Sequence, residues 1–175
     1  MANSAVDQDV LYEQAAATYT SAIERLARGY EPDPDKRRDL VQDIHVALWR
    51  SFAQFAGRAS MRTWVYRVAH NTAISRVTRR RAREPKFVTL EELADTPVAN
   101  DGTDDVDRRI ALERLLALIR RLDPIDRQVI LLYLEEFDAQ SIAEIVGIAP
   151  GNVATKVHRL KQILSRRFHG APHDA

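Results

Sequence analysis

The sequence predicts an all-α fold of two small helical domains joined by a flexible acidic linker. Along most of the 175 residues, apolar side chains recur every three or four positions, the period of a helix buried on one side. Segments rich in Pro, Gly and Asp interrupt these patterns at 29–35, 55–60, 95–105 and 122–124. Ten basic residues and one acidic residue lie between 50 and 86, whereas 89–107 contains seven acidic residues and no basic one.

The expected helices follow one another along the chain at 9–29, 36–55, 61–83, 106–122, 125–136, 139–146 and 150–168. We place a first domain at 16–86 and a second at 108–170, with the acidic linker at 87–107 and tails at 1–15 and 171–175. The linker has little periodicity, although we expect its apolar segment FVTLEEL to dock transiently.

The composition limits the classes of function. The chain has 45% hydrophobic and 29% charged residues and no cysteine, which excludes disulfides, cysteine nucleophiles and thiolate metal sites. No apolar run approaches the ~20 residues needed to span a bilayer. The N-terminus lacks the basic start and apolar core of a secretory signal. We therefore expect a cytoplasmic protein without membrane insertion, metal or cofactor.

One side of the expected helix 36–55 is acidic. The other side is apolar and is expected to face the core: Leu40, Val41, Ile44, Ala47, Leu48 and Phe55. Asp39, Gln42 and Asp43 lie opposite. Polar residues near a helix start complement the helix dipole, which is a sufficient explanation on its own. The same compact acidic patch would also suit a basic protein partner.

The expected helix 61–83 interleaves basic and aromatic side chains, a composition typical of single-stranded nucleic-acid binding. Cations follow the backbone, rings offer a stacking surface, and an amide such as Asn71 reads a base edge. Each of these features also fits a purely structural role. Trp64 fits the core equally well, Asn71 fits an interior hydrogen-bonded position, and the basic run 79–83 fits a solvated helix end.

Residues 141–164 predict a helix, a turn and a second helix. Gly147 stands where a helix end favours a left-handed residue, and Pro150 suits the first turn of the next helix. A buried stripe is expected from Val153, Val157, Leu160 and Leu164. No acidic residue occurs between 145 and 173. This layout is typical of a helix-turn-helix whose second helix enters the DNA major groove, although two packed helices with a solvated basic face give the same pattern.

These motifs together resemble bacterial sigma factors of the sigma-seventy family, in the extracytoplasmic-function (ECF) class. The segment 19–83, with DLVQD at 39–43 and T-W-x-x-R-x-A-x-N at 63–71, is similar to the family's second region. The segment 112–164, with L-x-P-x-x-R at 122–127, is similar to its fourth region. The resemblance implies a sigma-two helical bundle, a sigma-four helix-turn-helix domain, and a non-catalytic subunit that directs core RNA polymerase to promoters.

The resemblance also implies roles for particular residues. The residues implied to bind core polymerase are Asp39, Leu40, Gln42 and Asp43, which would contact a basic coiled coil of the large polymerase subunit. The residues implied to bind minus-ten DNA, including a flipped base, are Phe55, Ser60, Arg62, Thr63, Trp64, Arg67, Asn71, Ser75, Arg76 and Arg79. The residues implied to bind the minus-thirty-five duplex are Asn152, Thr155, Lys156, His158, Arg159 and Gln162. Control is expected from an anti-sigma factor, and the free chain is expected to be a monomer.

Three positions depart from the family's pattern. Ala149 stands where many members have a Ser that caps the recognition helix, and losing a cap costs ~0.5–2 kcal/mol. Ala154 replaces an Arg or Lys, and His158 replaces an aromatic residue. These changes concern which minus-thirty-five sequence is read and leave the expected role unchanged.

Other classes of function explain less of the chain. A stand-alone helix-turn-helix repressor or activator leaves the basic and aromatic helix at 61–83 unused, and it predicts a dimer seam that the sequence does not show. A small nuclease would need a carboxylate cluster or a phosphate-binding loop, and neither occurs. A helical bundle for protein interaction alone does not explain the segregated charge.

Overall fold

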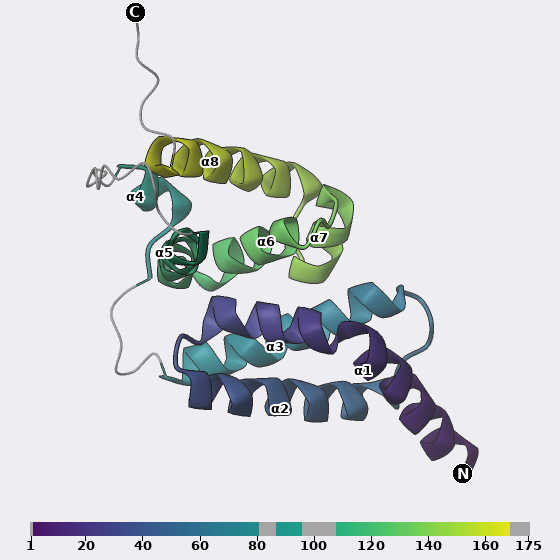
Figure 1. Ribbon diagram of the computed structural model, residues 1–175. Helices are drawn as coiled ribbons and strands as arrows, with labels where there is room; N and C mark the ends of the chain where they lie inside the picture. Colours follow the sequence, from purple (N-terminus) through teal and green to yellow (C-terminus); the bar gives the residue numbers. More distant parts are fainter. Residues whose placement is uncertain (1, 81–86, 96–107, 169–175) are drawn as a thin grey trace, which may run out of the picture. The chain divides into compact units, whose positions relative to one another are not determined.

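The computed structural model describes residues 2–80, 87–95 and 108–168 and divides into two compact units, Met1–Pro85 and Lys86–Ala175. The elements in chain order (Figure 1) are α1 (Ala2–Tyr30), α2 (Pro34–Phe52), α3 (Met61–Arg80), α4 (Leu90–Asp95), α5 (Arg108–Arg121), α6 (Pro124–Leu134), α7 (Ala139–Val146) and α8 (Pro150–Phe168). Across the described residues, the only pairing of β type is an isolated bridge between Val88 and Leu122. The prediction of an all-α fold is confirmed.

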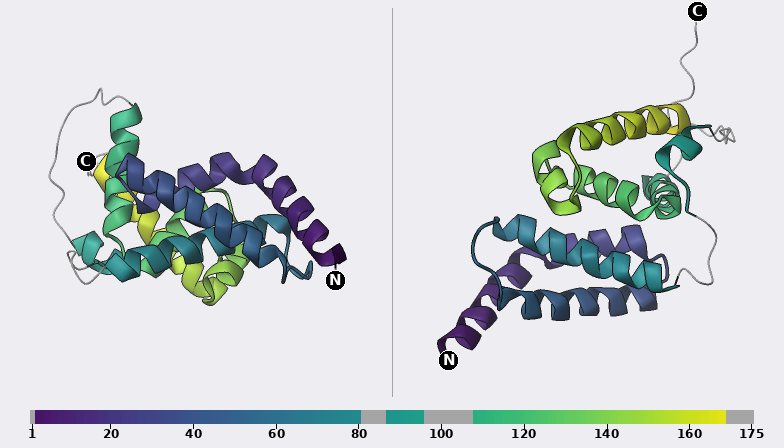
Figure 2. Two further views of the ribbon diagram at one scale, coloured as in Figure 1. Left: turned by 90° about the horizontal axis from the view of Figure 1, so that it is seen from below. Right: turned by 180° about the vertical axis from the view of Figure 1, so that it is seen from behind.

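The first unit is a bundle in which α1, α2 and α3 each pack on the other two (Figure 2). The core line of α2 recurs at every fourth residue, with Leu40, Ile44, Leu48 and Phe52 buried. This spacing keeps one side of the helix against its neighbours for its whole length. Phe55, expected within this helix, lies in the loop that follows it.

α1 begins earlier than the sequence predicted, so residues 2–15, expected as a tail, form the first half of this helix. Polar side chains tie this half to α2. Gln8 Nε2 donates to the carbonyl of Trp49 at 2.6 Å, and the Tyr12 hydroxyl lies 3.1 Å from His45 Nδ1. These contacts carry no apolar periodicity, which is why the pattern alone did not reveal them.

The starts of α2 and α3 are set by side-chain caps. Asp33 accepts hydrogen bonds from the backbone N–H groups of Asp35 and Lys36 at 2.9 and 3.2 Å. Ser60 Oγ accepts from the N–H of Thr63 at 3.0 Å. Each cap satisfies donors that the first turn of a helix leaves without an intrahelical partner.

In the second unit, α8 packs against α4, α6 and α7. The buried apolar residues come from all of the longer helices and include Leu116, Ile119, Val129, Ile130, Leu132, Ile142, Val153, Leu160 and Ile163. Helix α8 therefore packs on an apolar core within its own unit.

Residues 87–95, predicted as part of the linker, belong to the second unit and pack against the rest of it. The N–H of Val88 donates to the carbonyl of Arg121, and the N–H of Asp123 donates to the carbonyl of Val88, both at 2.9 Å. Leu90 and Leu93 of α4 are both 0% exposed. The rest of the expected linker, 96–107, lies outside the described residues.

Candidate nucleic-acid interface

The turn between α7 and α8 is built as the sequence predicted. Asp138 caps α7 by accepting from the N–H of Ser141 at 2.7 Å, and this bond holds the pKa of Asp138 below its ordinary value. Gly147 has φ 80°, so its expected left-handed conformation is confirmed. Pro150 opens α8, and Ala149 before it offers its carbonyl to the N–H groups of Asn152 and Val153 at 3.0 and 3.2 Å.

The core side of α8 differs slightly from the predicted stripe. Val153, Leu160 and Ile163 are 0%, 1% and 2% exposed, whereas Val157 and Leu164 are only half-buried. Seven residues fall just short of two full turns, so a stripe with this spacing drifts around the helix. The side of α8 that meets the core is therefore rotated toward Ile163.

The opposite side of α8 presents polar side chains. Five of the expected duplex-reading residues are exposed: Asn152, Thr155, His158, Arg159 and Gln162. The Thr155 hydroxyl donates to the carbonyl of Gly151 at 3.0 Å, and Gln162 Nε2 lies 3.1 Å from His158 Nε2. This ridge contains donors and acceptors suited to base edges, together with one cation, and no carboxylate.

Lys156, the sixth expected duplex-reading residue, is bound within the unit. Its ammonium pairs with the carboxylate of Asp126 on α6, which is 0% exposed, while the Lys156 side chain is 25% exposed. The other oxygen of Asp126 accepts from the N–H of Leu90 at 3.0 Å. Asp126 thus joins α4, α6 and α8. The motif L-x-P-x-x-R contains Asp126, but nothing in its spacing indicated that this carboxylate is buried.

In the first unit, α3 places part of the predicted minus-ten set on one line. Asn71, Ser75 and Arg79 are exposed and follow one another at every fourth residue, the spacing that stacks side chains along one face of a helix. Arg67, one turn before Asn71, is half-buried. An amide, a hydroxyl and a guanidinium therefore share one solvent-facing line.

An aromatic cluster joins the loop before α3 to the helix itself. The rings of Phe55 and Trp64 meet edge to face with centroids 5.3 Å apart. The indole N–H of Trp64 donates to Ser51 Oγ at 2.9 Å, and Trp64 is half-buried. Thr63 is only 7% exposed, so its side chain supports the loop from inside. The Arg62 guanidinium lies 5.9 Å from the centre of the Tyr66 ring.

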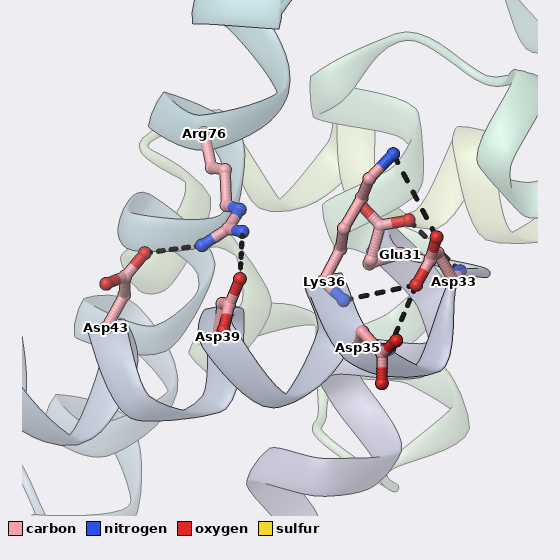
Figure 3. Close-up of polar contacts among 7 residues, drawn as sticks. All are labelled: Glu31, Asp33, Asp35, Lys36, Asp39, Asp43 and Arg76. Carbon is pink, nitrogen blue, oxygen red and sulfur yellow. Dashed lines mark hydrogen bonds and ion pairs between the residues drawn. The ribbon is translucent and has the colours of Figure 1, made fainter.

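The acidic side of α2 contains a contact that the sequence did not predict (Figure 3). Arg76 of α3 lies beside both aspartates, with Nη1 2.6 Å from Asp43 Oδ2 and Nη2 3.6 Å from Asp39 Oδ2. Gln42 is exposed next to them, whereas Leu40 is 1% exposed and belongs to the core. The structure therefore brings Arg76, expected on the minus-ten surface, to the expected core-binding surface.

The described residues contain neither a metal-binding cluster nor a membrane-spanning helix. Within residues 2–80, 87–95 and 108–168, no three or more His, Asp or Glu side chains are grouped so that they could hold a metal ion. None of the helices in that part of the chain is both long and apolar enough to cross a membrane.

Comparison with known families and proteins identifies the class. Residues 16–83 match Sigma-70 region 2, and residues 112–164 match Sigma-70 region 4. The RNA polymerase sigma-E factor of Streptomyces avermitilis is 29% identical over 168 residues, covering 94% of this chain and 88% of that protein. The ECF RNA polymerase sigma factor SigW of Bacillus subtilis is 24% identical over 173 residues, covering 93% and 90%.

Solved structures share the fold. CnrH in complex with the cytosolic domain of CnrY has a TM-score of 0.66 at 22% identity, over 94% of this chain and 91% of that one. The sigma factor RpoE of Bartonella quintana, in complex with the anti-sigma factor NepR, has a TM-score of 0.65 at 22% identity, over 89% and 94%.

The chain therefore belongs to the sigma-70 family, with regions 2 and 4 in the two units. Within that family it is a sigma factor of the ECF class, a non-catalytic subunit of RNA polymerase. A stand-alone helix-turn-helix regulator does not account for region 2, which occupies most of the first unit.

Proposed function

We propose that this ECF sigma factor binds core RNA polymerase through the acidic face of α2, defined by Asp39, Gln42 and Asp43. The carboxylates are 68% and 58% exposed, and the core residues Leu40 and Ile44 anchor the helix beneath them. A basic helical segment of the large polymerase subunit is the partner that this charge and shape favour.

We propose that the loop 55–63 and the exposed line of α3 take the minus-ten element as single-stranded DNA. The cluster of Phe55 and Trp64 supplies ring surface next to the loop, and Asn71, Ser75 and Arg79 supply polar and cationic groups along the helix. Base flipping costs a few kcal/mol, which stacking and pocket contacts must offset.

We propose that α8 reads the minus-thirty-five element in the duplex major groove. The observation that carries this assignment is the exposed carboxylate-free ridge of Asn152, Thr155, His158, Arg159 and Gln162, on the side of α8 opposite the buried Val153, Leu160 and Ile163. Lys156 is left out of the reading set, because its pair with Asp126 holds it against the unit.

We propose control by an anti-sigma factor in the cytoplasm, with the free chain as a monomer. Two of the structural relatives are complexes with a regulatory partner or a cytosolic protein domain. The second unit also has an open apolar groove of about 580 Å³ lined by Leu112, Leu115, Tyr133 and Leu164, with Leu112 45% exposed. An amphipathic partner helix would cover these side chains. Co-purification that returns only polymerase under every stress condition would contradict this control.

Run-off transcription with purified core polymerase, with and without the chain, tests the function directly. Promoter-specific transcripts from a genomic template set are expected only when the chain is present. Their absence on every template would refute the proposed promoter recognition.

A charge reversal separates polymerase binding from DNA binding. Asp39→Arg with Asp43→Arg should abolish holoenzyme formation, because a basic partner then meets a basic surface. Asp7→Arg with Glu13→Arg is the matched control, since it reverses two exposed carboxylates on α1 of the same unit. Holoenzyme formation that survives the first change would show that the polymerase binds elsewhere.

A further inference from the structure

We infer that Arg76 is a positioning residue of the core-polymerase-binding surface and not a DNA contact. The inference rests on the proposed function of the acidic face of α2. Sequence motifs placed Arg76 with the minus-ten residues, but its contacts and its position on α3 place it with Asp39 and Asp43.

The first support is the geometry of the ion pairs (Figure 3). One guanidinium reaches two carboxylates that stand one helical turn apart on α2, at 2.6 Å to Asp43 and 3.6 Å to Asp39. Both contacts use the Oδ2 atoms, so the Oδ1 atom of each carboxylate remains able to accept from a basic partner. A planar, forked guanidinium is suited to hold two carboxylates at a set separation, whereas an ammonium is a single point charge.

The second support is where Arg76 lies on α3. Val65, Ala69 and Ala73 are 1%, 0% and 0% exposed and face the bundle. Arg76 continues this inward line by one more turn and emerges beside α2, where its side chain is 26% exposed. The exposed Asn71 and Ser75 lie on a different side of the helix from Arg76, because they are five and one residues away from it, whereas Arg79, three residues on, borders Arg76 on the helix surface.

The direction in which polymerase affinity changes when Arg76 is neutralised distinguishes a positioning role from an effect of net charge. Removing the Arg76 charge leaves the acidic face more negative, so an effect through net charge alone would tighten binding to a basic partner. Positioning predicts weaker binding, because both carboxylates then lose their fixed orientation and must be ordered when the partner binds. The two carboxylates are mostly exposed, so water and salt screen the charge term, and we expect positioning to prevail.

The test measures holoenzyme assembly by fluorescence anisotropy of the labelled full chain with purified core polymerase. Arg76→Gln should weaken assembly about three- to tenfold, the range expected for a small number of partly exposed ion pairs. Arg76→Lys should fall between wild type and Arg76→Gln, since one ammonium cannot span both carboxylates. Arg50→Gln is the matched control: it removes an equal charge two turns beyond Asp43 on the same face of α2 and should leave assembly unchanged or slightly tighter.

The double variant Asp39→Asn with Asp43→Asn separates failure of this inference from failure of the proposed function. If it leaves assembly intact, the acidic face is not the polymerase site. If it weakens assembly while Arg76→Gln does not, the positioning role is refuted. With both carboxylates already neutral, adding Arg76→Gln should cost nothing further.

A second readout excludes a DNA role. Holoenzyme assembled at saturating core polymerase should bind a minus-ten single strand equally well with Arg76→Gln and with wild type. A loss of strand binding at full assembly would return Arg76 to the DNA contacts and overturn the inference. Unfolding of Arg76→Gln followed by tryptophan fluorescence checks the fold, and the milder Arg76→Lys decides the question if the glutamine variant is unstable.

Discussion

Replacing Asp126 by Ala should destabilise the second unit selectively. Asp126 is 0% exposed, pairs with Lys156 and accepts the N–H of Leu90 at 3.0 Å. The substitution removes the acceptor for both groups at once. It therefore separates α4 and α8 from the carboxylate that joins them to α6.

The size of the effect follows from burial. Removing one partner of a buried ion pair costs roughly 3–5 kcal/mol. The Lys156 side chain is 25% exposed and recovers part of its hydration, so we take the lower end, about 3 kcal/mol. In a unit of this size each 1 kcal/mol shifts Tm by roughly 4–8 °C, which predicts a fall of at least about 12 °C. Asp126→Asn keeps an acceptor for Leu90 and should cost about 1–2 kcal/mol.

Urea unfolding of the full chain offers an internal control, because both tryptophans, Trp49 and Trp64, lie in the first unit. Asp126→Ala should move the far-ultraviolet circular dichroism transition to lower urea and leave the tryptophan fluorescence transition in place. Asp138→Asn removes a carboxylate from the same unit but keeps a good helix cap, so it should be nearly neutral. A dichroism transition that does not move, or a fluorescence transition that moves equally, would refute the joining role of Asp126.

Further predictions concern local features of each unit. Gly147→Ala should destabilise the second unit by about 1–2 kcal/mol, since φ 80° strains any residue with a Cβ. Gly151→Ala, by contrast, should stabilise this unit by roughly a few tenths of a kcal/mol. Unfolding followed by circular dichroism compares the two variants. Ser60→Ala should cost the first unit about 1 kcal/mol by fluorescence-monitored unfolding. Burial lowers the pKa of His45 and outweighs the opposing effect of Glu24. The unfolded state therefore binds the proton more tightly, and the first unit should lose stability as pH falls from about 6.5 through the lowered pKa. A pH profile unchanged by His45→Gln would contradict this.

Local patterns were enough to predict most helices and the turn between α7 and α8. Gly147 and Pro150 act on their own backbone dihedral angles, and the line from Leu40 to Leu48 follows from the helical period. Such signals need only neighbours in sequence. A buried stripe on one side of α8 implies a solvated stripe on the other, whereas the duplex-reading roles of the residues on the exposed ridge came from the resemblance to the family.

Contacts between distant residues decided the rest. By sequence, Lys156 was assigned to DNA, Arg76 to the minus-ten surface and Leu90 to a linker. In the structure, Lys156 pairs with Asp126 and Arg76 pairs with Asp39 and Asp43. Leu90 lies in the core of the second unit. The sequence by itself thus determined the family, the helices and the exposed faces. Only the tertiary structure determined which charges on those faces are already paired within the chain, because an ion pair depends on how two helices pack and leaves no trace in the period of either one.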